Sequence, residues 1–138
     1  MKPLTREWVS KAEGDYATAR REVRARRQPN FDAVCFHAQQ CAEKYLKSLL
    51  LKHELVVART HNLEALAKPL LAAYPQLRQL TAKLRTLTAY AVETRYPGNS
   101  ADRELAHEAV MLCTEIRTAV RGALRISKKR HHAAVAAG

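Results

Sequence analysis

The chain has 138 residues, enough for one domain whose hydrophobic core holds it together without a disulfide or a structural metal. It contains only 4 Gly and 5 Pro, and strong helix formers dominate, so its composition argues against a β-rich fold. The net charge of +11 indicates an acidic partner such as RNA, a nucleotide phosphate or an acidic protein. Arg-rich and Ala-rich composition also occurs in bacterial proteins that bind no nucleic acid, so charge alone leaves both readings open.

Neither a signal peptide nor a membrane span is expected. The N-terminal sequence MKPLTREWVS lacks the apolar core of a signal peptide, and no stretch is apolar for the length of a bilayer crossing. The three cysteines, Cys35, Cys41 and Cys113, lie singly inside apolar helical patterns, where a free thiol acts as a small hydrophobe. These features predict a cytoplasmic protein in a reducing compartment.

Apolar residues at helical spacing predict two long helices in the first third of the chain. The first is capped by Thr5 and ends at Pro29. The second is capped by Asn30 and runs to about His53. It is apolar most of the way round, which is typical of a helix at the centre of a bundle or in an oligomer interface.

A short third helix precedes the fourth. It begins at Thr60 or Asn62, either of which can act as its N-cap. The fourth helix begins at Pro75, a residue that suits a first helical turn, and it stops at the Pro97-Gly98 break. The 3-4-3-4 spacing of leucines between these points predicts one buried face.

The last long helix begins near Ala101 or Asp102 and keeps its apolar face as far as Ile126. Short links between long amphipathic helices predict an all-α fold, an antiparallel up-and-down bundle of four long helices plus a short crossing helix. We expect this bundle to occupy residues 1–127. Residues 128–138 form a basic, non-periodic tail that we expect to be disordered.

A polar strip interrupts the second helix at Glu43, Lys44 and Lys47. Glu43 and Lys47 are four residues apart, a spacing at which a surface ion pair contributes a few tenths of a kcal/mol. The alternative is that the strip lines a groove shared with basic residues farther along the chain. His37 and Cys41 are also four residues apart, but no further ligands stand at metal-like spacing, so no metal site is predicted.

Two basic segments are candidate phosphate contacts. Arg59 and His61 lie beside a predicted helix start, where exposed N–H groups favour an anion, although His61 could instead cap or pack against the long helix. Arg95 could hold a phosphate or bond the last carbonyls of its own helix. Tyr96 precedes a proline, so it should leave the helix line and point into the end of the bundle.

Arginine-rich stripes on the first and last helices are a third basic feature. They comprise Arg20, Arg24 and Arg27, and Arg117, Arg121, Arg125 and Lys129. Each stripe could follow a phosphate backbone, and each also lies toward a helix C-terminus, where the helix dipole favours cations. Helices one and five should end at opposite poles, which would keep the stripes apart.

Three stretches taken together resemble the HEPN domain family. They are HAQQCAEKYLKSLLL in the second helix, RTHNL at Arg59–Leu63 and RYPG at Arg95–Gly98. They are similar to the branch often encoded beside a minimal nucleotidyltransferase. The resemblance implies a helical bundle that dimerises, that acts with such a partner in a toxin–antitoxin pair, or that binds a nucleotide such as ATP.

RNA-cleaving HEPN proteins share an Arg-x(4–6)-His motif at the start of the last long helix, at the dimer interface, and need no metal. The histidine would assist proton transfer and the arginine would stabilise phosphate charge. Here the residues at that distance from Arg95 are Ser100, Ala101 and Asp102. Arg103 and His107 are one residue too close, so they are catalytic candidates and enzyme activity stays open.

The leading hypothesis from the sequence is therefore a dimerising HEPN module that works with a nucleotidyltransferase and has no cofactor beyond a possible nucleotide. Its phosphate-contact candidates are Lys44, Lys47, Arg59, His61, Arg95 and Tyr96. The alternatives are a metal-independent ribonuclease toxin and a basic RNA-binding scaffold.

Overall fold

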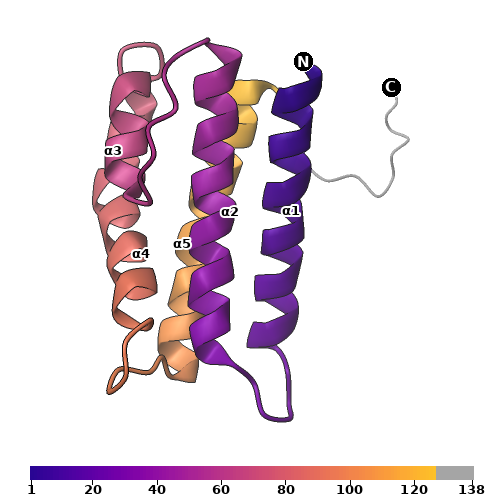
Figure 1. Ribbon diagram of the computed structural model, residues 1–138, viewed down its shortest axis with the longest axis vertical. Coiled ribbons are helices and arrows are strands. Elements are labelled where there is room, and N and C mark those ends of the chain that lie inside the picture. The colour runs from indigo at the N-terminus through magenta and orange to yellow at the C-terminus, as the bar shows by residue number, and fades with distance from the viewer. Residues whose placement is uncertain (127–138) are drawn as a thin grey trace.

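The computed structural model describes residues 1–126, whose long helices run alternately up and down (Figure 1). The elements are α1 (Pro3–Val23), α2 (Phe31–Lys52), α3 (Leu63–Ala67), the 3-10 helices η1 (Lys68–Leu70) and η2 (Pro75–Leu80), α4 (Thr81–Glu93) and α5 (Arg103–Leu124). The predicted all-α bundle with a short crossing helix is confirmed. The predicted basic tail, residues 128–138, lies outside the described residues.

Helix α2 lies at the centre of the bundle, as its wide apolar surface predicts. It packs against α1, α3, α4 and α5. Tyr45, Leu46 and Leu49 are buried along it with at most 1% of their surface exposed. Cys35, Cys41 and Cys113 are also buried, and all three are free thiols.

Polar caps begin three of the helices. Asn30, Asn62 and Asp102 each accept a hydrogen bond from a backbone N–H three residues farther on, at 2.8–3.0 Å. Each side chain thereby satisfies a donor that has no partner inside the helix. Of the two cap candidates for α3, Asn62 is the cap and Thr60 is not, and α5 begins directly after Asp102.

The first helix differs from its prediction at both ends. It begins at Pro3, with Lys2 at the N-cap position, because proline suits the first helical turn. Thr5 therefore lies inside the helix, fully buried, and its hydroxyl has no hydrogen-bond partner in the described part of the chain. The helix ends at Val23, well before Pro29, where the chain enters a turn.

The fourth and fifth helices also end earlier than predicted. The segment from Pro75 begins as the 3-10 helix η2, and α4 ends at Glu93, before the Pro97 break. Helix α5 ends at Leu124 because Arg125 adopts the left-handed conformation, with φ of 61°. No helix within residues 1–126 is long and apolar enough to cross a membrane.

The alternating helix directions bring two turns to one end of the bundle. The α1–α2 turn and the α4–α5 turn both lie at the lower end in Figure 1. They are joined there, since the backbone N–H of Ala101 donates to Asp32 Oδ1 at 2.7 Å. Helices α1 and α5 end at opposite poles, as expected.

Candidate functional site

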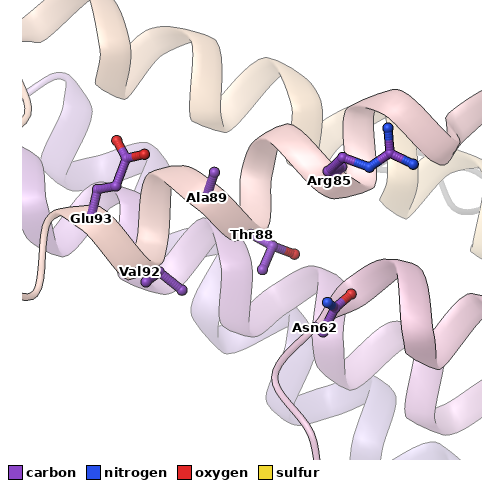
Figure 2. Close-up of a pocket in the computed structure, with 6 residues that line it drawn as sticks. All are labelled: Asn62, Arg85, Thr88, Ala89, Val92 and Glu93. Atoms are coloured by element: carbon purple, nitrogen blue, oxygen red, sulfur yellow. The ribbon is translucent and has the colours of Figure 1, made fainter.

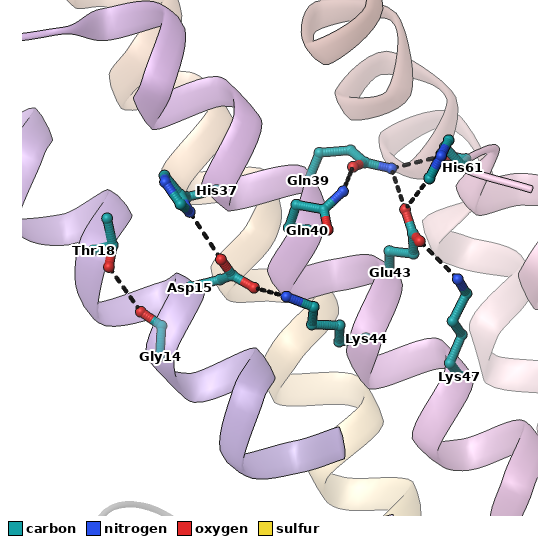
Figure 3. Close-up of polar contacts among 10 residues, drawn as sticks. All are labelled: Gly14, Asp15, Thr18, His37, Gln39, Gln40, Glu43, Lys44, Lys47 and His61. Carbon is teal, nitrogen blue, oxygen red and sulfur yellow. Dashed lines mark hydrogen bonds and ion pairs between the residues drawn. The ribbon is translucent and has the colours of Figure 1, made fainter. Parts of the chain in front are cut away.

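The polar strip of α2 is divided between two sides of the helix (Figure 3). On one side the Glu43 carboxylate, 5% exposed, accepts hydrogen bonds from Lys47 Nζ at 2.8 Å and Gln39 Nε2 at 3.2 Å, and it lies 3.0 Å from His61 Nδ1. Gln39 Nε2 also donates to the His61 carbonyl at 2.7 Å. The Glu43–Lys47 pair is therefore part of a network that ties α2 to the segment before α3.

The Glu43 network keeps its carboxylate ionised. Burial by itself would raise the pKa of Glu43, but the hydrogen bonds from Lys47 and His61 outweigh burial, so the pKa of Glu43 lies below its ordinary value. The negative charge in turn holds Lys47 and His61 in place.

Lys44 lies on the other side of the helix. Its ammonium donates to Asp15 Oδ2 of α1 at 2.5 Å, and the other oxygen of this carboxylate lies 2.8 Å from His37 Nδ1 (Figure 3). Lys44 thus bonds to α1, whereas Lys47 bonds to Glu43 of its own helix. Among residues 1–126, no three His, Cys, Asp or Glu side chains gather as a metal site would require.

An ion-pair network joins α1, α2 and α5 and was not predicted from the sequence. Arg117 donates two hydrogen bonds to Glu13, from Nε at 2.6 Å and from an Nη at 2.8 Å. The Tyr45 hydroxyl also donates to Glu13 and accepts from Arg121 at 2.9 Å. Burial would raise the pKa of Glu13, but the hydrogen bonds from Arg117 and Tyr45 lower it.

The predicted phosphate stripe on the last helix is therefore wrong for Arg117 and Arg121. Both guanidinium groups face Glu13 of α1, and each side chain is about 15% exposed or less. The i,i+4 spacing correctly places Arg117 and Arg121 on one face of α5. That face packs against Glu13 of α1 and is not open to a phosphate. Lys129 lies outside the described residues.

Arg59, Arg95 and Tyr96 are all exposed. Tyr96 is 60% exposed, so it does not point into the end of the bundle as the following proline suggested. Within the described chain, none of these three side chains has a hydrogen bond or an ion pair. Lys44 and Arg95 do not meet, since Lys44 bonds to α1 and Arg95 follows α4.

A pocket of about 320 Å³ opens between the start of α3 and one face of α4 (Figure 2). Its lining residues are Asn62, Arg85, Thr88, Ala89, Val92 and Glu93. The sequence hints at this pocket only through Val92, an apolar residue that lies off the 3-4-3-4 stripe of α4. In the structure Val92 is 41% exposed. Arg85 at its edge forms two hydrogen bonds with Glu64, at 2.9 and 3.0 Å.

The two catalytic candidates lie in the first turns of α5. Arg103 and His107 are both exposed, four residues apart on one helix face. The Arg103 guanidinium lies 4.9 Å from the ring centroid of Phe31, at the start of α2. Arg103 therefore packs against the end of the bundle where the α1–α2 turn lies.

A model of the HEPN domain matches residues 5–123, nearly all of the helical region. The chain belongs to the HEPN domain family. No curated protein sequence matches it.

Two solved structures share the HEPN fold of this chain. TT1696 from Thermus thermophilus is 25% identical, with a TM-score of 0.68 over 86% of this chain and 96% of its own. ST0689, described as an archaeal HEPN homologue, is also 25% identical, with a TM-score of 0.70 over 92% of this chain and 100% of its own. The HEPN fold thus accounts for the whole bundle.

Proposed function

We propose that this HEPN protein works as a homodimer beside a nucleotidyltransferase partner and binds a nucleotide such as ATP in the α3–α4 pocket. The observation that carries this proposal is the position of the pocket between the two basic segments. Asn62 at one end follows Arg59 and His61 in the chain, and Glu93 at the other end precedes Arg95. An arginine that has no ion pair within residues 1–126 therefore lies a few residues from each end.

The pocket suits a base and sugar better than a whole nucleotide. Its volume of about 320 Å³ is near the lower end of the range of roughly 300–1,000 Å³ for small-molecule sites. Ala89 and Val92 form an apolar wall on which a base can pack. Glu93 is negative and would repel phosphates, so we expect the phosphates to extend out of the pocket toward Arg59 or Arg95.

The test is a calorimetric titration with ATP at physiological salt on the full chain and two variants of α4. Ala89→Trp fills the pocket, whereas Ala82→Trp places the same side chain at an exposed position of the same helix. We expect Ala89→Trp to weaken ATP binding by at least about tenfold, equivalent to roughly 1.4 kcal/mol, and Ala82→Trp to leave it unchanged. Equal binding by both variants, or none by the natural chain, would remove the pocket from the proposal.

The same titration with adenosine locates the phosphate end. A variant that loses a phosphate contact weakens ATP binding but not adenosine binding, so Arg59→Ala and Arg95→Ala should separate the two ends of the pocket. Lys44→Ala tests the α2 strip. Loss of ATP binding in Lys44→Ala, with Ala89→Trp unaffected, would move the site to the α1–α2 side of the bundle.

A further inference from the structure

The fold divides the cations of the chain into those that bond to carboxylates and those that do not. Ion pairs within 4 Å hold Lys2, Lys44, Lys47, Lys83, Arg85, Arg117 and Arg121. These pairs neutralise positive charge on α2, α4 and α5 and at Lys2, just before α1. The positive charge of the remaining Lys and Arg side chains is therefore greatest where the chain has few carboxylates.

The α1–α2 turn is such a place. Residues 20–28 contain five arginines and one glutamate. Arg24, Arg26 and Arg27 are exposed, and within residues 1–126 their guanidinium groups have no hydrogen bond or ion pair. The glutamate, Glu22, is already engaged, since its Oε2 accepts the backbone N–H of Asn30 at 2.6 Å.

The turn is held at both ends. The end of α1 is closed by hydrogen bonds from the backbone N–H groups of Arg24 and Ala25, at 3.2 and 3.1 Å. Gln28 adopts the left-handed conformation with φ of 46°, and the Glu22–Asn30 bond then joins the turn to the start of α2. Because α1 has ended, the arginines do not form the predicted continuous helical stripe. They belong to a short turn whose backbone needs little further ordering when a ligand binds.

We propose that the α1–α2 turn binds the phosphate backbone of a nucleic acid strand through Arg24, Arg26 and Arg27. Guanidinium groups donate paired hydrogen bonds that match phosphate oxygens. Residues 24–30 include no aromatic side chain on which a base could stack, so the contact reads charge and not sequence. The same residues lack the apolar centre of a typical protein interface, which favours nucleic acid over an acidic protein.

This site does not depend on the proposed nucleotide pocket, because no residue is shared between them. It does lie at the end of the bundle where Arg103 packs on Phe31. A strand bound at the turn would therefore pass close to the start of α5.

The test is fluorescence anisotropy of labelled single-stranded RNA and duplex DNA, with the full chain, between about 50 and 200 mM salt. The turn variant is Arg24→Ala/Arg26→Ala/Arg27→Ala. The control, Lys11→Ala/Lys68→Ala/Arg78→Ala, removes three cations elsewhere on the surface. Circular dichroism checks that both variants are folded, and Arg26→Glu alone provides a milder second turn variant.

We expect the turn variant to weaken binding at least about tenfold at low salt and to reduce the salt slope by about 2, since each contact to a single strand contributes about 0.7. The control should change affinity far less. Tighter binding of RNA or of DNA identifies the natural strand. Equal losses in both triple variants would assign binding to diffuse charge and overturn the proposal. A natural chain that binds neither probe more tightly than about 100 μM would overturn it as well.

Discussion

At the scale of single residues, Glu43 does more than neutralise a lysine. Its buried carboxylate joins α2 to His61, one residue before the cap of α3. The same cap, Asn62, lines the α3–α4 pocket. Glu43 is therefore a positioning residue for one wall of that pocket.

Glu43→Gln should destabilise the fold by about 1–3 kcal/mol, because it leaves Lys47 and His61 without a charged acceptor. Urea denaturation at neutral pH measures this change. Glu7→Gln, an exposed change on α1, is the control and should unfold like the natural chain. A Glu43→Gln variant as stable as the natural chain would remove Glu43 from this positioning role.

The same variant tests the pH dependence of stability. Since the pKa of Glu43 in the fold is lower than its ordinary 4.5, its stabilising contribution is complete above about that pH. The contribution is lost as pH falls through the lower value of the folded state. The natural chain should therefore lose stability on acidification more steeply than Glu43→Gln, and parallel curves would contradict the assignment.

At the scale of elements, the start of α5 is fixed by its cap. Asp102 Oδ1 accepts the N–H of Leu105 at 2.8 Å, and its charge also favours the positive end of the helix dipole. This cap sets where Arg103 and His107 emerge at the end of the bundle.

Asp102→Ala should cost about 1 kcal/mol of stability, whereas Asp102→Asn keeps the accepting oxygen and should cost less. Thermal unfolding of both variants against the natural chain measures the difference. If the alanine and asparagine variants unfold at the same temperature, the cap contributes through charge alone.

Apolar spacing was enough to predict the helices and their order, and side-chain chemistry was enough to predict the cap Asn30 and to name Asn62 as one of two candidates for the cap of α3. The end of α1 was missed because Arg24, Arg26 and Arg27 are good helix formers, so the local sequence does not mark the stop at Val23. The 3-10 start of η2 was missed because leucine spacing is similar in both helix types.

The candidate site was harder to predict than the fold because its contacts join distant parts of the chain. Arg117 and Glu13 are 104 residues apart, and no local pattern shows that a helix face of arginines is covered by an acidic neighbour. The apolar pocket wall at Val92 was missed because single exposed apolar residues are common on protein surfaces.

At the scale of the whole molecule, the central helix α2 has one strip, through Phe36 and Gln40, that the other helices do not cover. Phe36 is 42% exposed on this strip, and its spacing along the helix puts it one turn before Gln40, between the side of Lys44 and the side of Glu43. An aromatic side chain there is well placed to pack against a second copy of the chain.

Phe36→Asp should convert the proposed homodimer to a monomer, because it places a charge where the two copies would meet. Light scattering after size-exclusion chromatography measures the mass. Met111→Asp is the matched control, since Met111 is 63% exposed on α5 and should keep the dimer intact. A monomeric natural chain, or dissociation by both variants, would place the interface elsewhere or remove it.

Because all three cysteines are buried, the folded chain should not react with thiol reagents. Burial raises the pKa of Cys35 to about 11. A hydrogen bond with Cys113, together with burial, raises the pKa of Cys41, so neither thiol presents the reactive thiolate at neutral pH. A single cysteine introduced by Arg26→Cys would then be the one thiol open to a maleimide dye. Fluorescence from that position would follow events at the α1–α2 turn without any need to remove the native cysteines from the core.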